Sequence, residues 1–267
     1  MITRNQIDFM KNIVKHIDKL YLGSFIKRIY RKLYSKIYLR KLEDNLGYKF
    51  IIHYKKNDYN YLSYLCDKYG SDKGGLNNSI KPFHCEPHTY SDFYSMIFDH
   101  CRYDVKRVFE CGIGLNKSIF ASNMVNNYKP GASLRVWRDY FINAKIIGAD
   151  INRDVLFQEE RIETFYIDQT NPVSINDFWK EVKLSDFDFV LDDGLHNFDA
   201  GLCLFEHSIT KLSERGIYII EDVQLYDMLK YKEHFLERNF QVDYVSLIPP
   251  SGLTQNNNLI MIRKSQA

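Results

Sequence analysis

The chain lacks the features that mark several large classes of protein. No uncharged apolar run reaches the roughly 18 to 20 residues that a bilayer span requires, and the N-terminus has no apolar segment followed by a small-residue cleavage site. We therefore expect a cytoplasmic protein. The five cysteines include no C-x-x-C pair, which argues against a disulfide framework and against a thiolate zinc site. No internal repeat and no low-complexity tract is visible.

The composition is that of a folded domain with an appendage. The 267 residues are 45% hydrophobic and 26% charged, which is enough for a full core, excludes intrinsic disorder and is short for two large domains. We expect three parts along the chain. Residues 1–62 form a basic amphipathic helical extension, residues 63–104 a connecting or cap segment, and residues 105–267 the main α/β domain.

Positive charge is concentrated near the N-terminus. Residues 1–56 hold 14 Lys and Arg against 4 Asp and Glu, whereas the whole chain has a net charge of only +2. Between Ile26 and Tyr38 apolar residues recur at helical spacing and basic residues fill the opposite face. Three interpretations stay open. The apolar stripe packs on the main domain or on a second subunit, which we favour, or the helix lies on an anionic membrane surface, or it binds a polyanion. We expect a homo-oligomer and no nucleic-acid partner.

From residue 105 the pattern is typical of an α/β fold. Apolar β-type runs alternate with amphipathic segments, which predicts a mostly parallel, Rossmann-like sheet with helices on both faces. The last two runs are separated only by a turn-rich loop, so they should pair antiparallel as a hairpin at one edge. The seven predicted strands are Val105–Glu110, Ala144–Asp150, Glu163–Asp168, Phe187–Asp192, Gly216–Glu221, Gln241–Leu247 and Asn258–Arg263.

The first five strands end at acidic residues or at a glycine-rich turn. Ligands of open α/β sheets bind outside the carboxyl ends of the strands, so these acids should converge on one crevice. After the first strand, Gly112 and Gly114 allow the backbone to approach a ligand closely, and Asp150 is placed to accept hydrogen bonds from ribose hydroxyls. Both nicotinamide and S-adenosylmethionine sites use an acid there. The antiparallel edge hairpin favours S-adenosylmethionine.

Two segments carry the most specific chemistry. Leu191-Asp-Asp-Gly-Leu-His196 and Ile220-Glu-Asp222 each follow a predicted central strand directly. Three carboxylates from adjacent strand ends suit Mg²⁺ or Mn²⁺, with water and substrate oxygens as the remaining ligands. A cation that binds an alcohol lowers the pKa of that alcohol, and His196 could then remove its proton at neutral pH.

The order of the motifs resembles that of the metal-dependent sugar O-methyltransferases of the macrocin and mycinamicin type. The resemblance extends over roughly residues 65–225. Its segments are Gly70-Ser-Asp-Lys-Gly74, His88-Thr-Tyr-Ser-Asp-Phe-Tyr94, Glu110-Cys-Gly-Ile-Gly114, Gly131-Ala-Ser-Leu-Arg-Val-Trp137, Gly148-Ala-Asp150, Asp168-Gln169, Asp192-Asp-Gly-Leu-His196 and Ile220-Glu-Asp222.

The resemblance implies a class I methyltransferase fold that uses S-adenosylmethionine and a divalent cation. We therefore expect methylation of a sugar hydroxyl, on a nucleotide-activated or polysaccharide-linked sugar such as those of surface glycans, with a nicotinamide-dependent sugar oxidoreductase as the alternative. The metal ligands would be Asp193, Glu221 and Asp222, and His196 would be the base. The residues assigned to the cofactor are Glu110, Gly112, Gly114, Ser133, Asp150, Asp168, Gln169 and Asp192. His88 and Tyr90 are assigned to the substrate.

Overall fold

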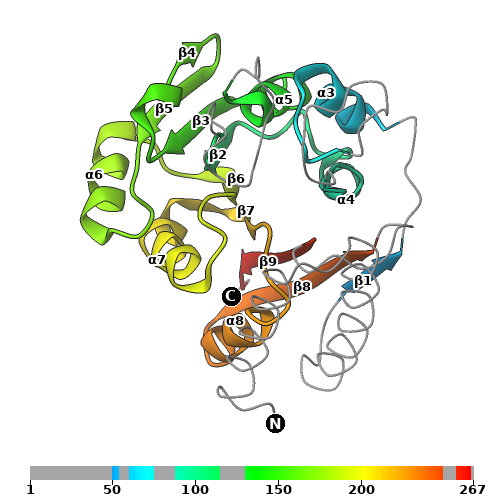
Figure 1. The fold of residues 1–267 in the computed structure, drawn as a ribbon, viewed down its shortest axis with the longest axis vertical. Helices are drawn as coiled ribbons and strands as arrows, with labels where there is room; N and C mark the ends of the chain where they lie inside the picture. Colours follow the sequence, from blue (N-terminus) through cyan, green and yellow to red (C-terminus); the bar gives the residue numbers. More distant parts are fainter. Residues whose placement is uncertain (1–49, 54–59, 75–87, 115–129, 249–256, 266–267) are drawn as a thin grey trace, which may run out of the picture.

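A computed structural model describes residues 50–53, 60–74, 88–114, 130–248 and 257–265 of the chain. The centre of the molecule is a single sheet in the strand order β1-β8-β9-β7-β6-β2-β3-β5-β4 (Figure 1). The strands are β1 (Phe50–His53), β2 (Arg107–Cys111), β3 (Lys145–Asp150), β4 (Gln158–Glu159), β5 (Ile162–Tyr166), β6 (Phe187–Asp192), β7 (Leu212–Ile220), β8 (Phe240–Ile248) and β9 (Asn258–Lys264).

The seven predicted strands are all present, as β2, β3 and β5 to β9. The five central strands β5, β3, β2, β6 and β7 run parallel to one another. The predicted hairpin is also confirmed, since β9 pairs antiparallel with both β8 and β7. The sheet also contains two short strands that the sequence did not predict. The strand β1 pairs parallel with β8, and β4 pairs antiparallel with β5, so the hairpin lies one strand inside the edge where it was expected.

Helices cover both faces of the sheet. They are α3 (Tyr61–Tyr69), α4 (Tyr90–Phe98), α5 (Ala132–Tyr140), α6 (Pro172–Val182), α7 (Phe198–Ser208) and α8 (Met228–Phe235). Alternate strand residues face opposite layers, as the strand period of two requires. Val108 and Ile146 pack with side chains of α3, α4 and α5, whereas Phe109 and Ile147 pack with those of α6, α7 and α8. Figure 1 shows α3 and α4 beside α5, across the sheet from α6 and α7.

The helices α3 and α4 and the segments next to them form a unit that we call the cap, defined as residues 60–74 and 88–98. Asn60 ties its two halves together, because its side chain accepts a bond from Ser63 N at the start of α3 and donates to Asp92 Oδ1 on α4, at 2.7 Å. The Ser63 and Ser91 hydroxyls are also hydrogen-bonded, 2.6 Å apart. These bonds fix the start of α3 against the start of α4.

Some predictions concern residues outside the described ranges. The predicted basic helix between Ile26 and Tyr38 is one of them, and so is most of the predicted extension of residues 1–62. The chain is described again from residue 130, where Gly131 N donates to Ile113 O at 2.9 Å. Within the described ranges, no helix combines the length and the apolar character needed to cross a membrane.

Candidate active site

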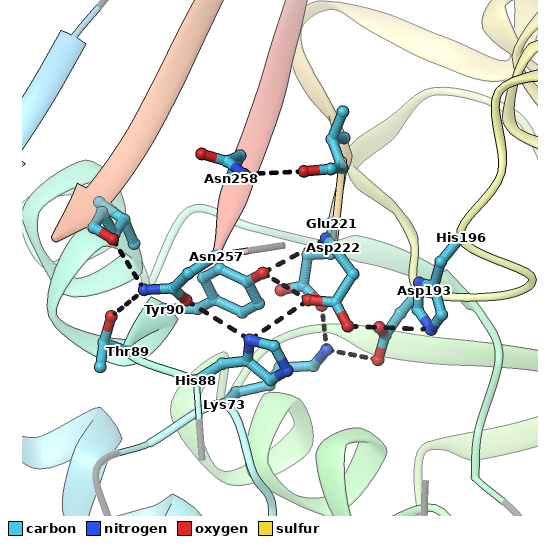
Figure 2. A network of polar contacts seen from close by, with 12 residues as sticks. Lys73, His88, Thr89, Tyr90, Asp193, His196, Glu221, Asp222, Asn257 and Asn258 are labelled. Atoms are coloured by element: carbon cyan, nitrogen blue, oxygen red, sulfur yellow. Dashed lines mark hydrogen bonds and ion pairs between the residues drawn. The ribbon is translucent and has the colours of Figure 1, made fainter. Parts of the chain in front are cut away.

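A buried lysine from the cap lies among acids from three strand ends. Lys73 Nζ is 2.7 Å from Asp193 Oδ2 and 3.4 Å from Glu110 Oε1, and it also donates to Glu221 Oε2. The Lys73 side chain is only 3% exposed. The three acids follow or end β2, β6 and β7, which are neighbours in the sheet. Three of the strand-end acids therefore surround one cation, Lys73, and Figure 2 shows its contacts with Asp193 and Glu221.

The charges in this cluster do not balance. Burial alone lowers the pKa of Lys73, but the surrounding carboxylates raise it well above its usual value, so the ammonium stays charged. Burial raises the pKa of Glu110 to about 7 and that of Glu221 well above its usual range, in spite of Lys73. One Glu110 oxygen, Oε1, is buried without a hydrogen bond. One ammonium thus faces two fully buried acids, Glu110 and Glu221, and the partly buried Asp193, so it can offset the charge of only one of the three.

The cap also supplies neutral donors to the same acids. Tyr94 OH donates to Glu221 Oε1 and Tyr90 OH to Asp222 Oδ1, each at 2.5 Å. The two tyrosines are four residues apart on α4, so one helix face carries both. Burial and the nearby carboxylates raise their pKa values well above the usual one, which keeps both hydroxyls protonated. Every acid of the Ile220-Glu-Asp222 segment is therefore held by the cap.

His88 approaches Asp222 from the cap side. Its Nδ1 lies 3.3 Å from Asp222 Oδ1, and its ring stacks on Tyr90 with 4.9 Å between centroids. The loop before β9 orients this histidine, because Asn257 Oδ1 is 3.4 Å from His88 Nδ1 while Asn257 Nδ2 donates to Thr89 Oγ1 at 2.8 Å. The structure therefore places His88 and Tyr90, which were assigned to the substrate, against the acids at the end of β7 (Figure 2).

Three of the predicted residues are close enough together to hold one ion. The ligand atoms of Asp193, His196 and Asp222 all lie within 4.8 Å of one another. His196 Nε2 is 3.9 Å from Asp222 Oδ2, and its side chain is 35% exposed. Glu221 is outside this group, because Lys73 and Tyr94 bind its two oxygens deeper in the protein. His196 and Asp222 both have left-handed backbone, with φ of 54° and 53°. Such strain is typical of functional positions.

The turn after β2 is built around Gly112 and Asp150. Gly112 has φ of +89°, and a Cβ there would lie 2.1 Å from Asp193 O. Gly112 therefore packs closely against the loop after β6. Asp193 N of that loop donates to Cys111 O. The Asp150 carboxylate accepts Ile113 N at 3.0 Å, Asn152 N at 2.8 Å and also a backbone bond from Ile151, which leaves part of its acceptor capacity free. Gly114, with φ of +87°, follows in the same turn.

The other residues assigned to the cofactor fall into two groups. Gln169 links two strand ends, since its Nε2 donates to Asp192 Oδ1 at 3.1 Å and its Oε1 accepts Leu195 N at 2.6 Å. Burial raises the pKa of Asp192 to about 6. Asp168 accepts two bonds from Thr170 in its own loop.

Glu110 and Ser133 form the second group and face inward. Glu110 has no exposed surface, and its carboxylate accepts hydrogen bonds from Ser133 and from Trp137 Nε1, the latter at 2.9 Å. Glu110 therefore supports the site from below rather than lining it.

The sequence reasoning missed three contributors, namely Lys73, Tyr94 and Asn257. Lys73 and Tyr94 lie inside two segments of the family resemblance, Gly70–Gly74 and His88–Tyr94, but the sequence pattern assigns neither of them a role. Their contacts join positions 120 to 148 residues apart, which spacing along the chain does not indicate. Asn257 lies in a turn-rich loop that carried no functional signal.

The chain is similar to several curated sugar O-methyltransferases, although no protein-family model matches it. It is 30% identical over 163 residues to the 8-demethyl-8-alpha-L-rhamnosyl tetracenomycin-C 2'-O-methyltransferase of Streptomyces olivaceus, a match that covers 61% of this chain and 38% of that protein. It is 29% identical over 136 residues to the demethylmacrocin O-methyltransferase of Streptomyces fradiae, covering 51% of this chain and 32% of that protein. The matches thus span about a third of the length of these relatives.

The fold is that of a class I methyltransferase. The structure is similar to the MycE methyltransferase from the mycinamycin biosynthetic pathway, solved in complex with Mg, SAH and mycinamycin VI, with a TM-score of 0.54 and 23% identity. That likeness covers 79% of this chain and 56% of the MycE chain. The resemblance to the macrocin and mycinamicin type and the Rossmann-like fold, both expected from the sequence, are confirmed.

Proposed function

We propose that this chain is an S-adenosylmethionine-dependent O-methyltransferase that acts on a sugar hydroxyl with the help of a divalent cation. The observation that carries the proposal is the group of Asp193, His196 and Asp222 at the ends of two central strands in a methyltransferase fold. The similarity to named sugar O-methyltransferases supports the choice of acceptor.

The residues present fit a divalent cation. The cluster holds three acids and one lysine, and burial raises the pKa values of Glu110 and Glu221, so a further positive charge would be needed to keep all three acids ionised. Carboxylate oxygens are the ligands that Mg²⁺ and Mn²⁺ prefer. We assign Asp193 and Asp222 as direct ligands and Glu221 as the third carboxylate of the set, consistent with the Mg reported in the MycE structure. A cation bound there would stabilise the ionised form of an acceptor alcohol.

His196 is our candidate for the base. Its ring is partly exposed and lies beside Asp222, so it can both meet an incoming hydroxyl and release the proton to solvent. Methyl transfer is an in-line displacement, in which the acceptor oxygen loses its proton as the bond to carbon forms. The Asp222 carboxylate, 3.9 Å from Nε2, would stabilise the imidazolium that forms. His88 and Tyr90, on the opposite side of Asp222, would position the sugar.

The cofactor is assigned to the ends of β2, β3, β5 and β6. Asp150 has free lone pairs for ribose hydroxyls, and Gly112 and Gly114 keep the turn beside it free of side chains. The Gln169 and Asp192 pair would complete the adenine end, with Asp168 next to it. Glu110 and Ser133 would act indirectly, by supporting the turn from inside.

Titration calorimetry tests the cofactor. S-adenosylmethionine and its demethylated product should both bind, and Asp150→Asn should weaken both. The matched control is Asp154→Asn, an exposed acid four residues further on that should leave binding unchanged. Binding of NAD(H) with no response to S-adenosylmethionine would refute the proposal in favour of the oxidoreductase, for which the relatives reported above offer no support.

The most detailed part of the proposal concerns the molecule to which the acceptor sugar is linked. We propose a sugar linked to a nucleotide or a polysaccharide, because the net charge of +10 on residues 1–56 would attract an anionic acceptor. The test compares turnover of the same sugar as a neutral glycoside, a nucleotide derivative and an acidic polymer. A clear preference for the neutral glycoside would refute the anionic carrier and leave the methyltransferase activity intact.

A further inference from the structure

The buried lysine of the cap has no role in the chemistry proposed above. Its ammonium contacts Asp193 and Glu221, two of the three carboxylates assigned to the cation, and lies near Glu110. Among the described residues, no other Lys or Arg forms an ion pair with these three acids. Lys73 is therefore the cation against which any incoming metal ion would have to compete.

The backbone around Lys73 holds the ammonium in place. Ser91 N donates to Lys73 O at 2.8 Å, which ties the residue to the first turn of α4. On the other side, His88 N donates to Asp72 O, also at 2.8 Å. A Cβ at Gly74 would lie 2.7 Å from Cys66 Cβ, so the strip packs tightly against α3 as well. Lys73 is thus a fixed charge, not a mobile surface side chain.

We propose that Lys73 is a built-in counter-ion that competes with the divalent cation for Asp193 and Glu221 and so weakens metal binding. The proposal rests on the metal role assigned to these carboxylates. A fixed positive charge repels a second cation that shares its ligands, and this repulsion is strong where water is excluded. In the absence of metal, the same ammonium holds the carboxyl groups of Asp193 and Glu221 in position. Lys73 is therefore a positioning residue that adjusts how readily the site takes up metal.

The test measures binding of Mn²⁺ alone, from the electron paramagnetic resonance signal of the free ion. Lys73→Met keeps the length of the side chain and removes its charge, so the Kd for Mn²⁺ should fall by about tenfold or more. Lys73→Arg keeps the charge and should stay within about threefold of the wild type. The matched control is Lys68→Met, whose lysine pairs with Asp139 away from the site and is 45% exposed. Its Kd should be unchanged.

A second pair of variants covers the case in which Lys73→Met does not fold. The double variant Lys73→Met with Glu110→Gln removes one charge of each sign from the cluster and is compared with Glu110→Gln alone. The double variant should bind Mn²⁺ about tenfold or more tightly than that single variant.

The outcomes separate the two proposals. A purely structural lysine would leave metal binding unchanged or weaken it when removed, which is the opposite of the expected effect. An equal or higher Kd in the charge-removed variants, with clear binding to the wild type, would overturn the role of Lys73 and leave the metal site standing. A wild-type protein that binds no Mn²⁺ would overturn both.

Discussion

Replacing Glu110 by glutamine should change how the stability of the metal-free protein depends on pH. Glu110 has no exposed surface, and its carboxylate is bonded to Trp137 and lies 3.4 Å from Lys73 Nζ. Burial is the dominant effect, and it raises the pKa of Glu110 from 4.5 to about 7 even though Lys73 lowers it. The folded protein therefore keeps a proton on Glu110 at pH values where the unfolded chain has released it.

The sign and size of the effect follow from this difference. Because the folded pKa is the higher one, Glu110 favours folding fully below about pH 4.5, and this contribution is lost as the pH rises through about 7. Each unit of difference corresponds to about 1.4 kcal/mol, so the whole loss amounts to about 3 kcal/mol. Glu110→Gln cannot titrate. The free energy of unfolding of the wild type, minus that of the variant, should fall by about 3 kcal/mol across this window and then level off.

Urea denaturation in the presence of a chelator, from about pH 5 to about pH 8.5, measures this difference. Other titrating groups cancel, since both proteins contain them. Glu163→Gln is the matched control, because Glu163 is 41% exposed and pairs with Lys145 on the surface, and its difference curve should be flat. A flat curve for Glu110→Gln would mean that burial does not govern this carboxyl. A difference that rises with pH would mean that Lys73 outweighs burial.

Three further predictions concern the site and the extension. His196→Ala should lower turnover by about 10²- to 10⁴-fold with the affinity for S-adenosylmethionine unchanged, and the loss should shrink at high pH; unchanged turnover would place the base elsewhere. Gly112→Ala should lower the free energy of unfolding by about 2–4 kcal/mol, because the new Cβ would lie 2.1 Å from Asp193 O and the backbone φ is +89°. Urea denaturation measures this, and an unchanged free energy of unfolding would contradict it. Removal of residues 1–49 should leave binding of cofactor and Mn²⁺ intact, since the first residue of the described site is Lys73; calorimetry showing loss of either would place part of the site in the extension.

The sheet could be predicted because its sequence signals are local. Each central strand is a run of apolar residues that alternate between two covered faces, as Val108 and Phe109 do, and such runs stand out from the polar segments around them. The two missed strands carry little signal. The strand β4 has two residues and β1 has four, and both exist only because a neighbouring strand offers free backbone groups. Pairing of that kind depends on the assembled sheet.

The candidate site was predictable in part for the same reason. Asp193, Glu221 and Asp222 end or follow strands, so the parallel sheet alone brings them to one edge. The cap residues follow no such rule. Nothing in local periodicity indicates where α4 docks, and a buried lysine goes against the usual exposure of that residue type. The position of Glu221 deep beside Lys73, apart from Asp222 and His196, depends on this docking.

The cap also sets an order of events during synthesis of the chain. Lys73 and Glu221 are 148 residues apart, so at roughly 5–20 residues per second the ribosome needs about 7 to 30 s to supply the partner of Lys73. Until the strands that follow the cap have been made, Leu62, Leu65, Tyr94 and Phe98, which are at most 2% exposed in the finished protein, have no sheet to cover them. The nascent cap is thus a long-lived apolar segment on the ribosome. Chaperones that bind such segments should therefore influence the yield of this protein more than that of a chain whose cap follows its sheet.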